Sequence, residues 1–207
     1  MAQGKESKRW YQRHVDDEYV RRAQKEGYRS RAAYKLQEID QRYHLLKPGQ
    51  VVVDLGAAPG SWSQLAQKKL GARGRLWALD VLTMTPVPGV ECLQGDFTEQ
   101  GVLDLLLQRL QGRPVDLVIS DMAPNITGIA LADQAKAMAL AELAMDFALQ
   151  VLHEKGVFLV KVFQGSDYTS FLQKMRKQFK EVRSIKPKAS RSKSREIYLL
   201  GGRLQRT

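Results

Sequence analysis

The strongest constraint on the fold is a series of short, nearly continuous apolar segments separated by segments with helical periodicity. The expected strands cover residues 51–56, 75–80, 90–96, 115–121, 157–163 and 196–202, and the expected helices between them cover 61–70, 98–110, 132–152 and 167–179. Strands of this kind, joined by helices, form a parallel sheet that is covered on both faces. The sequence therefore predicts a doubly wound α/β domain.

Two further helices are expected before the first strand. One covers residues 16–27, and the other follows Ser30, the expected N-cap, and carries Lys35 at the edge of its apolar stripe. No linker or internal repeat interrupts the chain, so we expect a single domain. Within it, residues 1–48 form a basic helical extension and residues 49–207 form the core.

The charge of the chain is concentrated at its two ends. The 207 residues carry a net charge of +11, of which residues 1–35 contribute +5 and residues 174–207 contribute +10, whereas residues 36–173 carry −4. Two basic ends on a near-neutral body are expected if both ends face a polyanion such as nucleic acid. The alternative is that these basic residues are simply solvated.

Several classes of protein are excluded by composition. Cys92 is the only cysteine, which rules out an internal disulfide and a cysteine-clustered zinc site, and three scattered histidines do not suggest a metal cage. The first residues lack the apolar stretch of a secretory signal, and no run is long enough to span a bilayer. We therefore expect a cytoplasmic protein without a metal site.

Four carboxylates follow or end the expected strands. Asp54 lies near the end of the first strand, and Asp80, Asp96 and Asp121 end or directly follow later ones. In doubly wound sheets, ligands bind beyond the carboxyl ends of the strands. Each residue alone has an ordinary interpretation as a helix cap or loop residue, but four at one edge of one sheet indicate a ligand site.

The segment from Asp54 to Gly60 is a glycine-containing loop of the kind that binds nucleotides. Gly56 and Gly60 allow a ligand to approach the backbone at the start of the next helix. The loop matches neither the G-x-G-x-x-G dinucleotide fingerprint nor a P-loop. Asp80 lies 24 residues after Gly56, near the spacing at which an acidic residue binds the hydroxyls of an adenosine ribose. This combination suggests S-adenosylmethionine, with a tight turn that binds no ligand as the alternative.

Three charged side chains can share this edge of the sheet. Lys161 interrupts the apolar strand VFLVKVF near its carboxyl end. A buried lysine is costly unless it is paired or neutral, and the neutral amine is a general base. The alternatives are that Lys161 extends to solvent, that Lys35 is an exposed helix residue, and that Glu196 pairs with a neighbouring surface cation.

The order of the motifs identifies a family. The segments SKRWYQ, AQKEGYRSRAAYKL, VVVDLGAAPGSWSQ, LQGDF, SDMAPN, VKVFQG and SRSKSREIY cover nearly the whole chain, and together they resemble the FtsJ-type ribose 2′-O-methyltransferases. The resemblance implies a Rossmann-like class I methyltransferase sheet of seven mostly parallel strands, of which the last is antiparallel. It also implies S-adenosylmethionine-dependent methylation of a uridine ribose in large-subunit (23S) ribosomal RNA.

The resemblance assigns roles to individual residues. It implies a catalytic tetrad of Lys35, Asp121, Lys161 and Glu196, and cofactor-binding residues Gly60, Trp62, Asp80, Asp96 and Asp121, with the loop that contains Asp54 and Gly56 around them. The family commonly has a second glycine where this chain has Ser61. Without the resemblance, Trp62 is interpreted as a packing residue.

The implied mechanism and partners complete the expectations. Lys161 is the expected general base, and the partner is 23S ribosomal RNA in the assembled 50S subunit, with no membrane, no obligate protein partner and a monomeric state. The basic residues expected to hold RNA phosphates are Lys5, Lys8, Arg9, Arg29, Arg31, Lys186, Lys188, Arg191, Lys193 and Arg195, and Trp10, Tyr11 or Tyr28 is expected to stack on a base. The alternatives are the same reaction on transfer RNA or an mRNA cap, and a non-catalytic RNA-binding factor for ribosome assembly.

Overall fold

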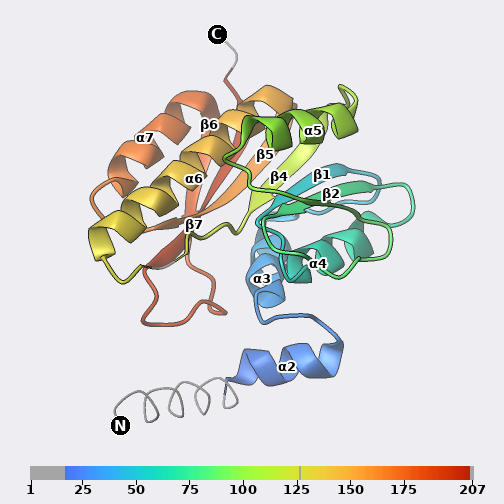
Figure 1. Cartoon of the computed structure of the whole chain (residues 1–207), viewed down its shortest axis with the longest axis horizontal. Helices are drawn as coiled ribbons and strands as arrows, with labels where there is room; N and C mark the ends of the chain where they lie inside the picture. The colour runs from blue at the N-terminus through green and yellow to red at the C-terminus, as the bar shows by residue number, and fades with distance from the viewer. Residues whose placement is uncertain (1–16, 126, 206–207) are drawn as a thin grey trace.

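A computed structural model describes residues 17–125 and 127–205 (Figure 1). Seven strands form one sheet in the order β3-β2-β1-β4-β5-β7-β6. Only β7 runs antiparallel to its neighbours β5 and β6, which confirms the predicted class I arrangement. The strands are β1 (Val51–Leu55), β2 (Arg75–Asp80), β3 (Glu91–Gln94), β4 (Val115–Ser120), β5 (Leu152–Phe163), β6 (Phe179–Ile185) and β7 (Glu196–Leu204).

Helices cover both faces of the sheet, as the continuous apolar strands require. They are α2 (Glu18–Glu26), α3 (Ala33–Tyr43), α4 (Ser61–Leu70), α5 (Gln100–Leu110), α6 (Ala130–Val151) and α7 (Tyr168–Gln178). Figure 1 shows α5, α6 and α7 on one side of the sheet and α3 and α4 on the other. Consecutive residues of β1 alternate between the two cores, because Val53 faces the first group and Val52 faces the second.

Helices α2 and α3 precede the first strand. Asp17 caps α2 by accepting a hydrogen bond from the backbone N of Tyr19 at 3.0 Å, and Gly27 ends the helix with φ of 75°. Helix α3 packs in the core below the sheet, although the sequence places it in an extension of residues 1–48. The boundary at residue 48 stays a prediction.

The predicted N-cap of α3 is wrong. The helix begins only at Ala33, and the hydroxyl of Ser30 accepts a hydrogen bond from the backbone N of Ala32 within the preceding turn. Ser30 therefore organises the turn that leads into α3 rather than the helix end itself.

The sequence did not predict strand β6, and it predicted a shorter β5 than the structure has. Strand β6 lies at the edge of the sheet and exposes four of its residues, so it lacks the apolar run that marks the inner strands. Strand β5 begins at Leu152 rather than residue 157, with a register irregularity between Val115 and Leu117 of its neighbour β4. Both features depend on pairing with other strands.

The part of the chain that the structure describes contains no helix with the length and apolar character to cross a membrane. Over the same residues, no three side chains of the His, Cys, Asp or Glu types are grouped to hold a metal ion. The expected roles of Lys5, Lys8, Arg9, Trp10 and Tyr11 lie outside the described residues.

Candidate active site

A cavity of about 610 Å³ opens at the carboxyl edge of the sheet. Four of the predicted cofactor residues line it: Gly56, Asp80, Asp96 and Asp121. Much of the remaining lining is apolar, with Leu79, Val81, Leu82, Phe97, Met122, Leu140 and Leu143, and the polar side chains of Thr98, Asn125 and Lys136 also line the cavity. Three of the four predicted strand-end carboxylates, Asp80, Asp96 and Asp121, thus line one cavity, and Asp54 does not.

The loop after β1 is shaped by two glycines. Gly56 has φ of 75°, and a Cβ there would lie 2.6 Å from the Met122 side chain and 2.8 Å from its backbone. Gly60 has φ of 104°, and a Cβ there would lie 2.6 Å from Arg29 Nη1. Side chains are therefore excluded at both positions by the positive φ and by neighbouring atoms.

Two carboxylates fix the loops around the cavity. Asp80 accepts hydrogen bonds from the backbone N of Ala58 at 2.9 Å and of Leu82 at 2.8 Å. Asp96 accepts from the backbone N and the hydroxyl of Thr98, and these hydrogen bonds hold the pKa of Asp96 below its usual value. Each carboxylate can accept further hydrogen bonds, because each oxygen has two lone pairs.

Asp54 lies beneath the loop rather than in the cavity. Its side chain is fully buried, and Oδ2 accepts a hydrogen bond from the Ser63 hydroxyl at 2.6 Å. Burial raises the pKa of Asp54 to about 7, and the charges of Asp121 and Asp80 act in the same direction against the lowering effect of the Ser63 hydrogen bond. Asp54 therefore supports the loop from below, whereas Gly56 lines the cavity.

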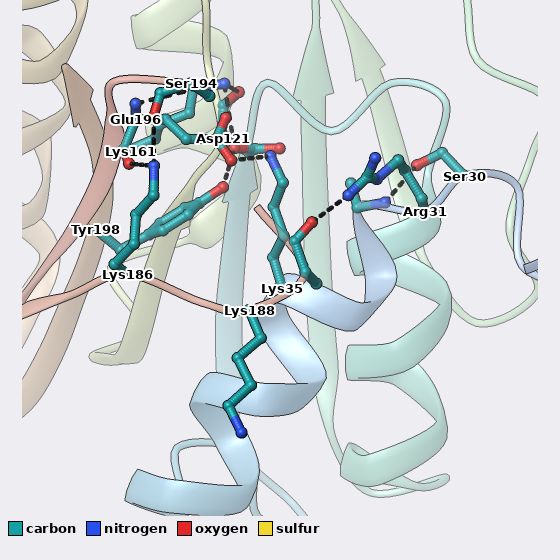
Figure 2. A network of polar contacts seen from close by, with 12 residues as sticks. Ser30, Arg31, Lys35, Asp121, Lys161, Lys186, Lys188, Ser194, Glu196 and Tyr198 are labelled. Atoms are coloured by element: carbon teal, nitrogen blue, oxygen red, sulfur yellow. Dashed lines mark hydrogen bonds and ion pairs between the residues drawn. The ribbon is translucent and has the colours of Figure 1, made fainter. Parts of the chain in front are cut away.

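Lys161 and Asp121 form the buried centre of the site (Figure 2). Lys161 Nζ lies 2.6 Å from the backbone O of Asp121 and 3.1 Å from Oδ1, and the lysine side chain is only 8% exposed. Burial tends to raise the pKa of Asp121, but the cations of Lys161 and Lys35 outweigh it, so this pKa lies below its usual value. The carboxylate stays ionised and directs the lysine.

Lys35 and Glu196 form the second pair of the predicted tetrad. Lys35 Nζ lies 2.7 Å from Glu196 Oε1, and both side chains are largely buried. Burial tends to raise the pKa of Glu196, but Lys35 outweighs this effect and lowers it overall. The antiparallel course of β7 brings Glu196 opposite Phe163, two residues from Lys161 on β5, so the predicted tetrad is assembled.

Tyr198 is a member of this cluster that the sequence analysis missed. Its hydroxyl donates to Asp121 Oδ1 at 2.7 Å, and its buried ring lies 5.7 Å from the ring of Trp62. Burial raises the pKa of Tyr198 well above its usual value, and the Asp121 charge adds to this effect. A tyrosine inside an apolar strand looks like a core residue, and only its register opposite Lys161 reveals the contact.

A second cavity, of about 940 Å³, lies on the other side of the tetrad. Lys35 and Glu196 line it, whereas Asp121 lines the first cavity. The remaining lining comes from the start of α2, the turn before α3 and the loop before β7: Asp17, Tyr19, Ser30, Arg31, Ala32, Lys188, Ser190, Arg191, Ser192, Lys193 and Ser194. Residues of the tetrad therefore line both cavities: Asp121 lines the first, and Lys35 and Glu196 line the second. We call the second cavity the basic cavity.

Besides Asp54, two predicted cofactor residues do not line the first cavity. Trp62 is 2% exposed, and its indole N–H donates to the backbone O of Ala32 at 2.7 Å, in the core between α3 and α4. Gly60 is the N-cap residue of α4. Their direct roles toward a cofactor stay predictions, and the structure gives both residues a packing role.

Three of the predicted RNA-binding cations are bound to the protein itself. Arg29 donates to the backbone O of Pro59, Thr85 and Pro86. Arg31 pairs with Asp17 and donates to the backbone O of Ala189. Lys186 donates to the backbone O of Ser194 and Glu196. The exposed cations on the same side are Lys188, Arg191, Lys193 and Arg195.

The first cavity fits S-adenosylmethionine in size and in chemistry. Its volume lies within the usual range for small-molecule sites, about 300–1,000 Å³. Carboxylates such as Asp80 and Asp96 suit the hydroxyl and amino groups of the adenosine part of the cofactor. The carboxylate of Asp121 suits the positive charges of its methionine part, the sulfonium and the ammonium group. Phe97 and Leu82 offer apolar surface for a purine ring. The residues present therefore fit the cofactor that the sequence suggests.

The sheet order and this site define a Rossmann-like methyltransferase. A family model of FtsJ-like methyltransferases matches residues 28–204. The chain is 58% identical over 201 residues to "Ribosomal RNA large subunit methyltransferase E" of Azoarcus sp., covering 97% of this chain and 98% of that protein. It is 56% identical over 201 residues to the protein of the same name in Chromobacterium violaceum, with the same coverage.

A solved structure agrees with these relatives. A Plasmodium falciparum chain named as a ribosomal RNA methyltransferase superposes with a TM-score of 0.77 at 30% identity, covering 86% of this chain and 98% of that one. The chain belongs to the FtsJ-like methyltransferase family. It is thus an enzyme whose methyl donor is S-adenosylmethionine.

Proposed function

We propose that this enzyme methylates the 2′-hydroxyl of a uridine ribose in 23S ribosomal RNA of the large subunit, with Lys161 as the general base. The observation that carries the proposal is the buried Lys161–Asp121 pair, of which Asp121 lines the first cavity, while Lys35 and Glu196 of the same cluster line the second, basic cavity. A hydroxyl nucleophile needs a proton acceptor beside the methyl donor, and this pair supplies one.

The contacts of Lys161 explain how an amine can act there. A neutral amine has two N–H groups and one lone pair, and Asp121 offers two acceptors, its backbone O and Oδ1. When both N–H groups are donated to Asp121, the lone pair is directed away from it and is free to accept the hydroxyl proton. Tyr198 fixes Asp121 in turn, through a hydrogen bond to Oδ1.

Bound S-adenosylmethionine supplies a methyl group on a sulfonium, which is already electrophilic. The protein has to align the ribose hydroxyl with that methyl group and remove its proton, and alignment alone contributes several kcal/mol, roughly 7–11 in the best cases. Lys35 and Glu196 border the basic cavity, so we assign them to holding the ribose and its neighbouring phosphate. Asp80 and Asp96 hold the cofactor.

The substrate assignment is supported by the relatives and by the basic cavity. The Azoarcus and Chromobacterium proteins are named for large-subunit ribosomal RNA, and they match nearly the full length of this chain. We propose the assembled 50S subunit as the substrate, the cytoplasm as the compartment and a monomer as the active form. The alternatives are transfer RNA as the substrate and a non-catalytic RNA-binding role in ribosome assembly.

The test of the reaction is transfer of tritiated methyl groups to 50S subunits from cells that lack this protein, beside naked ribosomal RNA and bulk transfer RNA. We expect label in one uridine ribose of 23S RNA, located by nuclease mapping. Label only in transfer RNA would replace the substrate. Cofactor binding without transfer to any RNA would favour the binding-factor role.

The role of Lys161 is tested by Lys161→Met, which keeps an unbranched side chain, one atom shorter, but removes the amine. We expect methyl transfer to fall by about 10²–10⁴-fold, the usual contribution of a general base. Cofactor and RNA affinities, measured by calorimetry and filter binding, should stay near those of the wild type. Near-normal transfer by Lys161→Met would exclude Lys161 as the base.

A further inference from the structure

The loop between β6 and β7, residues 186–195, is attached to a distant part of the chain. We call it the basic loop, because it carries Lys186, Lys188, Arg191, Lys193 and Arg195. The carboxylate of Glu38 on α3 accepts hydrogen bonds from the backbone N of Lys188 at 2.7 and 3.0 Å and of Ala189 at 3.3 Å. Glu38 and Lys188 are 150 residues apart in sequence.

Glu38 lies one helical turn from a tetrad residue. Lys35 and Glu38 are three residues apart on α3 and therefore share a face of the helix. Lys35 reaches Glu196 at the end of the basic loop, while Glu38 reaches the loop near its start. One face of α3 therefore binds the basic loop near its start and binds Glu196 directly after its end, and most of the loop between these contacts lines the basic cavity.

Other contacts fix the same point of the loop. Arg31 donates to the backbone O of Ala189, and the Ala189 methyl group is buried beside Ala23 and Tyr34. These contacts hold the loop at Ala189, but Glu38 alone pairs with both successive backbone N–H groups among the hydrogen bonds of the described residues. Beyond this point the loop turns into the cavity with its exposed cations Arg191 and Lys193.

We propose that Glu38 is a positioning residue for RNA. It holds the basic loop in the conformation in which the loop and the tetrad face the same RNA strand. The inference rests on the proposed function and assigns Glu38 a part in substrate binding, not in the chemical step. No side-chain atom of Glu38 has to touch RNA, because it acts through the backbone of Lys188 and Ala189.

The energetics favour a local effect. Hydrogen bonds to a charged group stabilise more than those between neutral groups, and here they order a ten-residue loop whose conformational entropy favours the disordered state. The buried Ala189 and the Arg31 contact remain when Glu38 is changed, so the domain stays folded. The loop then samples more conformations, and RNA binding has to order it.

The experiment compares Glu38→Ala and Glu38→Gln with wild type, and uses Glu91→Gln as the matched control. Glu91 also forms a polar pair, with Arg109, but on the outer strand β3. We expect the KM for RNA to rise about tenfold in Glu38→Ala, with kcat and cofactor affinity nearly unchanged. Glu38→Gln should lie between, since its single carbonyl oxygen still accepts from Lys188. Hydrogen exchange of the backbone amides of the loop should speed up in both variants and not in the control.

The outcomes separate the inference from the proposed function. An unchanged KM in Glu38→Ala would overturn the positioning role. A decrease of kcat, cofactor affinity and melting temperature together with the rise in KM would also overturn it, because it would indicate a general loss of structure. If the wild type transfers no methyl group to RNA, the proposed function fails. The positioning role of Glu38 can then still be tested by the affinity for a single-stranded RNA probe and by hydrogen exchange of the backbone amides of the basic loop. Unchanged exchange and unchanged probe affinity would then refute the inference.

Discussion

Asp54 illustrates how one buried residue can report on the stability of this fold. It lies one residue before the end of β1, under the glycine loop and fully buried, with its pKa raised to about 7 mainly by desolvation. Its only hydrogen-bond donor among the described side chains is Ser63. Because an unfolded aspartate has a pKa of about 3.9, the folded state holds this proton more tightly, and the free energy of unfolding depends on pH.

The sign of this dependence follows from the raised pKa. The contribution of Asp54 to stability is fully present below about pH 3.9 and is lost as the pH rises through about 7, when the folded carboxyl ionises. We predict that Asp54→Asn removes this loss, which amounts to at most about 4 kcal/mol. Urea unfolding at pH 5 and pH 8 measures it: the difference between the two free energies should shrink in the variant.

Ser63→Ala is the companion variant for this prediction. It removes the hydrogen bond that lowers the Asp54 pKa, so the loss of stability should extend to higher pH and the difference between the free energies at pH 5 and pH 8 should grow. A pH dependence that is identical in the wild type and in Asp54→Asn would show that other groups account for it.

At the scale of elements, the turn before α3 connects both cavities. Arg29 binds three backbone carbonyls, Pro59 in the glycine loop and Thr85 and Pro86 in the segment after β2. Ser30 contacts the Ser61 hydroxyl at 2.8 Å. Ser61, where the family commonly has glycine, thus has a defined partner, and the turn fixes the cofactor loop relative to the basic cavity.

Arg29→Lys tests this connection. One ammonium group cannot span three carbonyls in fixed directions as the guanidinium does. We therefore predict about a tenfold weaker affinity for S-adenosylmethionine, with RNA affinity changed much less. Calorimetric titration of the cofactor measures this, and Arg73→Lys on the opposite edge of the sheet is the control. Equal cofactor affinity in Arg29→Lys and wild type would remove the assigned role.

At the scale of the whole molecule, the proposed RNA-binding surface and the cofactor cavity differ in charge. The exposed cations of the basic loop lie beside the second cavity, and the first cavity is lined by carboxylates. Binding of RNA to such a surface releases counterions and weakens with salt. A small-molecule cofactor held by buried and partly buried groups is screened less.

We predict that glutamine at four exposed positions of the basic loop lowers the salt dependence of RNA binding. The expected decrease in the slope of log affinity against log salt is up to about 3, since each phosphate contact on a single strand contributes about 0.7. Cofactor affinity should not change. The changed residues are Lys188, Arg191, Lys193 and Arg195, and the control set, exposed away from the site, is Lys47, Lys68, Arg73 and Lys155. Equal slopes in both sets would place RNA elsewhere.

The inner strands and the carboxylates at their ends were predictable for a physical reason. Strands such as β4 are buried on both faces, so their apolar runs are visible without any partner. Carboxylates at the ends of parallel strands necessarily meet at one edge, which placed Asp80, Asp96 and Asp121 together. The roles of Lys35 and Glu196 came from the family resemblance, since nothing local in their segments distinguishes them from surface residues.

The features that were missed all depend on partners distant in sequence. Strand β6 is defined by pairing with β7, and Tyr198 by its register opposite Lys161. Arg29 and Arg31 look like RNA-binding residues until the carbonyls of Pro59 and Ala189 are found beside them. A basic residue in a sequence carries no sign of whether its partner is a phosphate or its own backbone.

The sequence by itself determined the class of sheet, the edge at which the ligands bind and the side chains available for methyl transfer. The class of sheet and its ligand-binding edge follow from hydrophobic periodicity and from the geometry of parallel strands, and the tetrad follows from the resemblance of the sequence motifs to the family. Only the tertiary structure decided which charged groups are paired, where the two cavities meet, and that one face of α3 holds the basic loop. These depend on contacts between residues far apart in sequence, such as Arg31 and Ala189, which are 158 positions apart, and folding alone brings such residues together.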